Sequence, residues 1–363
     1  MRARLTGSLF LICIFALFIL SQVITPPVIS VSERRPLATF PKLNLSTLQS
    51  AEFMNKFEGY AADSFVFREQ FRTTRAMVVL DAFRMLDKDG LFRGQSGLGK
   101  FARINEVEYQ KMFDKINLLV SKLPSMKVYF AMVPDKSIYA GTFLPGFDLK
   151  LAEQLAKDSL QGIKYIDLST SLQADSFYYT DLHWNQIKLQ PVINSLASEM
   201  DFKPITISDL NIQGDFFGVY AGQLALPVAP DSMSYMKPSN IDSYQVSTLS
   251  NDGTIVPANM YDLSGFTSED PYNFFLQGPT SLIWIDTGVA NNRILYLFRD
   301  SFSSSLAPLI AFGESYQEIV LIDLRYIDSR ILDTYVTFKP DSDVLFLYSS
   351  QIMNNSSVIK ISE

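Results

Sequence analysis

Residues 293–312 read RILYLFRDSFSSSLAPLIAF, and this stretch decides the fold. Residues 293–298 predict a strand, because a near-continuous apolar run is typical of a strand covered by helices on both faces. Residues 306–312 predict a helix, so Ser301 falls in the strand-to-helix turn. Enzymes with α/β folds expose a nucleophile at such a turn, and the first amides of the helix could bind an oxyanion. The alternative is a plain helix cap, where serine is also favoured.

Strands and helices alternate on both sides of this segment. An open, mostly parallel α/β sheet flanked by helices is the economical arrangement, because parallel strands need crossover connections. Residues 203–285 show no clear periodicity, and we expect a long irregular insertion that rims the active site. The other predicted strands are 127–133, 163–168, 318–322 and 344–348, and the other predicted helices are about 106–122, 150–161, 185–199 and 329–338.

The N-terminus has the pattern of a targeting segment. Arg2 and Arg4 precede an apolar run over residues 9–20, which predicts a signal anchor over residues 1–25 with the rest of the chain outside the cytoplasm. A cleaved signal peptide is the alternative. Residues 26–45 are rich in proline and polar groups and are predicted to be a tether. Residues 46–363 are then the catalytic domain, which starts with two helices broken near Asp63.

Composition excludes several classes of function. The 363 residues carry a net charge of −7, which argues against nucleic-acid binding because such binding needs a basic face. The only cysteine, Cys13, lies in the N-terminal apolar run, and the chain has one histidine. Disulfides, thiolate chemistry and histidine-rich or cysteine metal centres are therefore excluded, and only an all-oxygen cation site stays possible. We expect no cofactor.

The single histidine, His183, stands two residues after Asp181 and directly before Trp184. A carboxylate at this spacing could accept the Nδ1 proton and leave Nε2 free to act as a base. The alternative is a histidine with a purely structural role, which is common for a lone histidine beside an aromatic ring.

A series of short segments resembles a known family. In chain order these segments are ERRPLA at 33–38, FEGY at 57–60, DSFVFR at 63–68, VPDK at 133–136, TDLHW at 180–184, YNFFL at 272–276, RDSF at 299–302, IDLRY at 322–326 and VLFLY at 344–348. Their order is similar to that of the DHHW branch of the alginate O-acetyltransferase (AlgJ/AlgX-like) group, in the SGNH hydrolase-like superfamily. Leu182 stands where the family has the first histidine of its motif.

The resemblance implies a catalytic triad in which Asp181 orients His183, His183 is the base and Ser301 is the nucleophile. It also implies transfer of acetyl groups to hydroxyls of an extracellular or cell-wall polysaccharide, with a membrane-bound O-acyltransferase as a partner that supplies the acetyl group. An acetylesterase with the same triad is one alternative. A non-catalytic glycan-binding or scaffold protein of the cell envelope is another.

Three further residues are candidate substrate contacts. Arg325 and Lys136 each follow a predicted strand, so both could line the rim of the site. A structural ion pair of Arg325 with Asp323 or Asp328 is the alternative for that residue. Tyr179 could stack on a sugar or donate to an oxyanion, although an aromatic residue beside an active loop is usually part of the packing.

Overall fold

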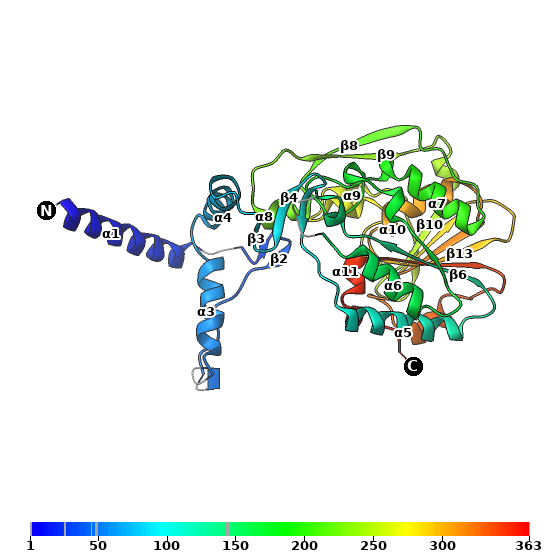
Figure 1. Cartoon of the computed structure of the whole chain (residues 1–363), viewed down its shortest axis with the longest axis horizontal. Coiled ribbons are helices and arrows are strands. Elements are labelled where there is room, and N and C mark those ends of the chain that lie inside the picture. Colours follow the sequence, from blue (N-terminus) through cyan, green and yellow to red (C-terminus); the bar gives the residue numbers. More distant parts are fainter. Residues whose placement is uncertain (1, 25–26, 45, 48–49, 142–145, 363) are drawn as a thin grey trace. The chain divides into compact units, whose positions relative to one another are not determined.

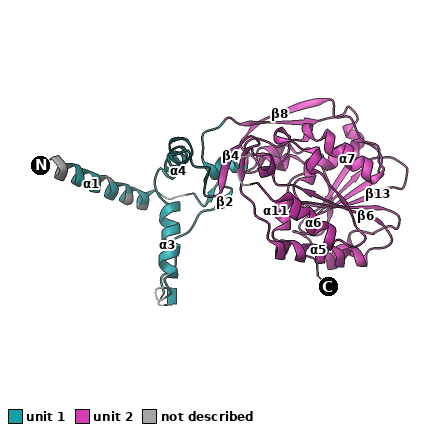
Figure 2. Ribbon diagram, in the orientation of Figure 1, with its two compact units in different colours: residues 1–89, 219–228 teal, residues 90–218, 229–363 magenta. Residues whose placement is uncertain are grey.

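The computed structural model describes residues 2–24, 27–44, 46–47, 50–141 and 146–362. The chain divides into two compact units (Figure 2). Unit 1 comprises residues 1–89 and 219–228, and unit 2 comprises residues 90–218 and 229–363. Every residue predicted to carry the chemistry lies in unit 2.

Unit 2 is built on one mixed sheet with strand order β11-β10-β12-β14-β13-β15-β6-β7. The five strands from β14 to β7 run parallel to their neighbours, whereas β11, β10 and β12 extend the sheet with antiparallel pairs. The bounds are β6 Lys127–Val133, β7 Lys164–Ile166, β10 Gln245–Leu249, β11 Ile255–Ala258, β12 Leu282–Asp286, β13 Ile294–Arg299, β14 Glu318–Ile322 and β15 Asp343–Ser349.

Helices cover both faces of this sheet (Figure 1). Alternate residues of the central strands point to opposite faces, because side chains along a strand alternate. In β13, Leu295 and Leu297 join the core on the side of α7 (Gln190–Met200) and α10 (Ser303–Phe312). Tyr296 and Phe298 join the core on the side of α5 (Glu106–Lys122) and α6 (Leu149–Ser159). The predicted sheet flanked by helices is therefore confirmed.

The segment 203–285 differs from the irregular insertion that we predicted. It supplies β10, β11 and most of β12 to the main sheet, and it forms a separate hairpin of β8 (Leu210–Phe216) and β9 (Asp231–Met236). Strand β10 reads QVSTL, which is too short and too polar to give a periodic signal. Antiparallel pairing on an otherwise parallel sheet makes the sheet mixed. The predicted helix 329–338 is also shorter, since residues Ser329–Thr334 form a 3-10 helix.

Unit 1 contains α3 (Glu52–Asp63) and α4 (Arg68–Met77), and the break between them falls at the predicted place. The segment predicted to be a tether includes two short paired strands, β1 (Ile29–Ser30) and β2 (Arg35–Pro36). Arg35 donates both terminal nitrogens to the carboxylate of Asp63, at 2.8 and 2.7 Å. The ERRPLA and DSFVFR segments of the sequence are thus joined by a bidentate ion pair.

The N-terminal apolar run forms helix α1 (Arg2–Val23), and Leu9, Phe10 and Phe15 on it are exposed. No helix in the described part of the chain has both the length and the apolar character needed to cross a membrane.

Candidate active site

Asp181, His183 and Ser301 form a continuous hydrogen-bonded chain. The Asp181 Oδ2 lies 2.6 Å from His183 Nδ1, and His183 Nε2 lies 2.8 Å from Ser301 Oγ. Asp181 and His183 are buried, at 1% and 4% exposure, while Ser301 is half-buried. An imidazole held between a carboxylate and a hydroxyl can take the hydroxyl proton, because the carboxylate stabilises the imidazolium that results. The structure thus brings together the three residues predicted from the sequence.

The turn that carries Ser301 lies between β13 and α10 and is fixed by Asp300. One oxygen of Asp300 accepts from the Phe302 amide at 3.0 Å, and the other accepts from the Ser349 amide, at the end of β15, at 2.7 Å. The amides of Ser303 and Ser304 donate to the carbonyls of Asp300 and Ser301. These first amides of α10, which we expected to bind an oxyanion, are therefore used inside the turn.

His183 lies on a short loop whose two ends are paired. Phe177 and Trp184 form an antiparallel bridge, and the Tyr178 amide donates to the His183 carbonyl at 3.1 Å. Asp231 holds the middle of the loop, because its carboxylate accepts from the amides of Tyr179 and Thr180, each at 2.7 Å. Charge-assisted bonds to a half-buried carboxylate fix these backbone positions.

Gly218 allows the chain to pass directly against Asp181. A Cβ added at Gly218 would lie 2.2 Å from the Asp181 Cβ and 2.6 Å from the Asp181 nitrogen. The Gly218 amide also donates to the Thr180 hydroxyl at 2.8 Å. Any larger residue at position 218 would have to displace the carboxylate-bearing loop, so glycine is needed here for close approach rather than for its backbone freedom.

Lys136 lies beneath the loop and not at the rim where we placed it from the sequence. It is 3% exposed, and its Nζ donates to the carbonyls of Tyr178 and Asp181 at 2.9 and 2.8 Å. Burial lowers the pKa of Lys136 to about 8, against the attraction of nearby carboxylates such as Asp181 and Asp231. Its position is that of a brace for the histidine loop.

Aromatic side chains enclose the imidazole. The ring of Tyr272 stacks on His183, with 3.7 Å between centroids and an angle of 3° between planes. The Tyr272 hydroxyl donates to Ser305 Oγ at 2.7 Å, and the Trp184 indole nitrogen donates to the same oxygen at 3.0 Å. Ser305 belongs to α10, so the helix that follows the candidate nucleophile also positions the side chains of Tyr272 and Trp184.

Arg325 forms the ion pair that was the alternative to substrate binding. Its Nε and one terminal nitrogen donate to the two oxygens of Asp323, at 2.9 and 2.6 Å. Burial lowers the pKa of Arg325, but the bonds to Asp323 hold the pKa above its ordinary value. Arg299 is fully buried close by, and one of its terminal nitrogens donates to Ser304 Oγ at 2.7 Å. Asp323 and Arg325 therefore bind each other, in place of the substrate contact that we predicted for Arg325.

Tyr179 is the one candidate substrate contact with a well-exposed side chain, at 40%. Its backbone is fixed at both ends, since its amide donates to Asp231 and its carbonyl accepts from the Leu98 amide at 2.7 Å. A phenol ring anchored in this way beside Asp181 remains available to a ligand. The described residues contain no group of three or more histidine, cysteine, aspartate or glutamate side chains that could hold a metal ion.

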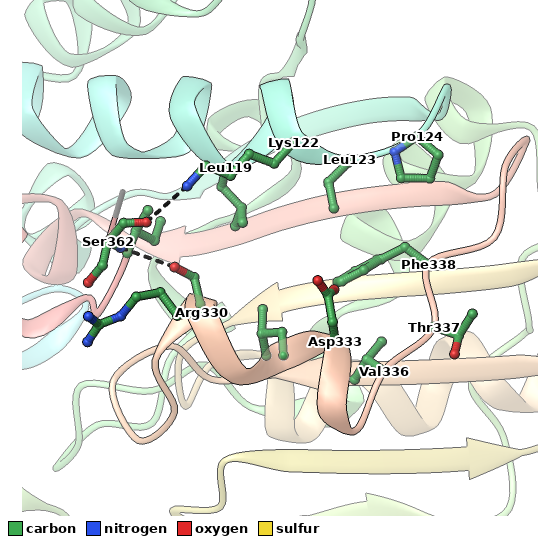
Figure 3. A pocket seen from close by; sticks show the side chains of 13 residues that line it. Leu119, Lys122, Leu123, Pro124, Arg330, Asp333, Val336, Thr337, Phe338 and Ser362 are labelled. Atoms are coloured by element: carbon green, nitrogen blue, oxygen red, sulfur yellow. Dashed lines mark hydrogen bonds between the residues drawn. The ribbon is translucent and has the colours of Figure 1, made fainter.

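None of these residues lines the cavity of about 760 Å³ that is drawn in Figure 3. Leu123 and Pro124, which precede β6, line it, as do Val336 and Phe338, which precede β15. Parallel strands β6 and β15 both begin at this edge of the sheet, whereas Ser301 follows the opposite end of β13. The cavity therefore has no part in the proposed chemistry.

Some of the supporting residues lie in recognisable sequence segments, and others do not. Tyr272 and Lys136 both lie in segments that resemble the family, but we assigned no role to Tyr272. Asp231 and Gly218 lie in the stretch without periodicity, where nothing in one sequence marks a residue as the neighbour of Asp181. Their contacts with the loop arise only when the chain folds.

Comparison with solved structures places the fold among DHHW-type proteins. A DHHW family protein from Eubacterium siraeum aligns with a TM-score of 0.60 and 19% identity, over 76% of this chain and 98% of that one. Bacillus cereus PatB1 aligns with a TM-score of 0.56 and 18% identity, over 74% and 99%. The O-acetyltransferase domain of Pseudomonas putida AlgJ has a TM-score of 0.43 and 12% identity, over 73% of this chain and 92% of that one.

No family model and no curated protein matches the sequence. The predicted resemblance to DHHW-type proteins is confirmed in the fold, which covers nearly the whole of both leading neighbours.

Proposed function

We propose that the chain is an O-acetyltransferase that transfers acetyl groups to hydroxyls of a polysaccharide through a covalent acetyl-Ser301. The observation that carries the proposal is His183, whose two ring nitrogens lie 2.6 Å from Asp181 and 2.8 Å from Ser301. The choice of an acetyl group and a polysaccharide rests on the resemblance to the DHHW branch.

In the first half of the reaction, Ser301 Oγ attacks the carbonyl carbon of the acetyl donor while its proton passes to His183 Nε2. The bond to the leaving group breaks, and His183 returns the proton to that group. In the second half, a sugar hydroxyl gives its proton to His183 and attacks acetyl-Ser301. The ester bond to Ser301 breaks, and the serine hydroxyl is restored. Asp181 keeps the imidazole in the required tautomer throughout.

We further propose an extracytoplasmic location and a membrane-bound O-acyltransferase as the acetyl donor. The support for this location is in the sequence, where Arg2 and Arg4 precede the apolar run of residues 9–20. The support for the donor is the family resemblance alone.

The test exposes the protein to an aryl acetate and follows acetylation by intact-mass and peptide mass spectrometry, with an oligosaccharide added afterwards. Wild type should gain one acetyl group on Ser301 and pass it to the sugar, and Ser301→Ala should gain none. Ser303→Ala is the matched control, because the Ser303 hydroxyl is buried two residues away and has no hydrogen-bond partner among the described residues. Equal labelling of wild type and Ser301→Ala would refute the proposal, and release of acetate only to water would indicate an esterase.

A further inference from the structure

A second site stands apart from the catalytic residues in unit 2. A cavity of about 510 Å³, here called the tyrosine cavity, is within the ~300–1,000 Å³ range of small-molecule sites. Aromatic and polar side chains from β9, the turn 237–244 and the segment that follows β11 line it. The lining used below consists of Tyr235, Lys237, Asp242, Tyr244, Asn259, Tyr261 and Phe274.

Three rings form one wall of the tyrosine cavity. Tyr235 meets Tyr261 and Phe274 edge-on, with centroids 4.7 and 4.9 Å apart, and Tyr261 stacks on Phe274 at 5.2 Å. Phe274 is buried, whereas Tyr235 and Tyr261 are half-buried. Rigid rings with polar ends give large contact area to a ligand that has both apolar faces and hydroxyls.

A chain of hydrogen bonds connects this wall to α10, so its position is fixed before any ligand binds. The Tyr261 hydroxyl donates to the Met236 carbonyl at 2.7 Å, and the Met236 amide donates to Gln186 Oε1 at 3.0 Å. The Gln186 amide nitrogen in turn donates to the Ser305 carbonyl in α10 at 2.7 Å. A pre-ordered site increases affinity, because binding then costs little side-chain conformational entropy.

A second cavity, of about 440 Å³, adjoins the first across the turn 237–244. The two share Tyr244, whose hydroxyl donates to Glu314 at 3.1 Å. Because the two cavities share a lining residue, a polymer could occupy both with successive units, whereas a compact metabolite would occupy only one.

The charges favour a neutral polymer. The exposed Lys237 and Asp242 contribute opposite charges to the tyrosine cavity, and the whole chain has a net charge of −7. An acidic polysaccharide would be repelled by a net negative protein. Asn259 adds an exposed amide that can both donate to and accept from sugar hydroxyls.

We infer that the tyrosine cavity is a non-catalytic subsite for a neutral oligosaccharide and holds a stretch of the acceptor polysaccharide away from Ser301. The class of ligand rests on the proposed function. The subsite itself does not need an active triad, because no triad residue lines the cavity. Binding and catalysis can therefore fail independently.

The test is isothermal titration of the full-length chain with short oligomers of β-1,4-linked glucose and of β-1,4-linked N-acetylglucosamine, and with an oligomer of mannuronate as the acidic comparison. Wild type and Ser301→Ala should bind at least one neutral oligomer equally well, and the mannuronate oligomer more weakly. Tyr235→Ala should weaken binding about tenfold, as expected for loss of ~1.4 kcal/mol of ring contact. Tyr235→Phe should retain most of the affinity.

The control is Tyr335→Ala, which removes another half-buried tyrosine outside both cavities and should leave affinity unchanged. Thermal unfolding of every variant separates lost binding from lost folding. The inference is overturned if neither neutral oligomer binds, if mannuronate binds more tightly, or if folded Tyr235→Ala binds like wild type. Loss of acetyl transfer in Ser301→Ala with unchanged binding would leave both proposals standing, whereas transfer unaffected in Ser301→Ala would refute the proposed function alone.

Discussion

Lys136→Met tests whether the buried ammonium group acts as a brace for the histidine loop or as a substrate contact. In the structure its Nζ lies between the carbonyls of Tyr178 and Asp181 and is out of reach of solvent. Methionine has similar length and is apolar, but it cannot donate to either carbonyl. We expect kcat to fall strongly while KM changes little and the protein still folds.

The loss of stability is limited because two terms oppose each other. The two bonds from a charged donor contribute about 1.5–3 kcal/mol each, and the variant loses both. Keeping the charge in this buried position costs about 3 kcal/mol net of the attraction to nearby carboxylates, since the pKa of Lys136 falls from 10.5 to about 8 and each unit is worth about 1.36 kcal/mol. Methionine removes this cost. The free energy of unfolding should therefore drop by no more than about 3 kcal/mol.

The effect on catalysis is larger because the freed loop carries Asp181 and His183. A displacement of about 1 Å in a catalytic group can cost about 10²-fold in rate. Steady-state kinetics with an aryl acetate and urea unfolding together measure the two effects. Lys157→Met is the matched control, because the Lys157 side chain is 61% exposed on α6 and pairs only loosely, at 3.8 Å, with Glu153. A raised KM with unchanged kcat in Lys136→Met would refute the brace and make Lys136 a substrate contact.

Three further predictions concern the same loop and its neighbours. Lys136 keeps its proton up to pH ~10.5 in the unfolded chain but only up to about pH 8 in the folded protein, so between these values the stability of wild type relative to Lys136→Met should increase as the pH rises. Urea unfolding of both proteins at about pH 8 and at pH ~10.5 measures this, and a constant difference in stability would contradict it. Gly218→Ala should lower kcat at least ~10-fold, because the added Cβ would lie 2.2 Å from the Asp181 Cβ. The control Gly59→Ala should leave kcat unchanged, because its nearest contact would be 3.9 Å away, and a kcat of Gly218→Ala equal to that of wild type would refute the need for close approach. Tyr272→Phe should lose about 0.5–1.5 kcal/mol of stability, measured by thermal unfolding, because it lacks the hydrogen bond to Ser305, but it should keep its kcat. Tyr272→Leu should also have a lower kcat, because only leucine removes the ring that stacks on His183.

The core of the sheet could be predicted from sequence because its signal is local. Strands β6 and β14 begin and end at the predicted residues, and β13 differs by one residue at each end. Each is an apolar run buried on both faces, so composition alone marks it. Strands β10 and β11 carry polar or exposed side chains at the sheet's edge, and their pairing depends on contacts distant in sequence. No local pattern contains that information.

In the candidate site too, local sequence patterns predict some residues, whereas others are brought there only by contacts distant in sequence. Asp181 and His183 are two residues apart, so their contact follows from a short loop, and Ser301 is marked by the strand-to-helix turn. The residues that hold the loop come from elsewhere in the chain. Whether Lys136 faces solvent or the interior depends on how the loop after Phe177 folds over it, and the position after a strand is the same in both cases.

Leu182 shows why the site can differ from the family motif and keep its geometry. The leucine side chain is half-buried and packs against the apolar core on the α7 and α10 side of the sheet, whereas the His183 ring lies between Asp181 and Ser301. The two adjacent positions therefore have different neighbours, and only the second can reach the serine. An apolar side chain at the first position adds burial without removing any hydrogen bond from the Asp181–His183–Ser301 chain. The proposed chemistry consequently needs one histidine, and the sequence provides one at the position that the geometry requires.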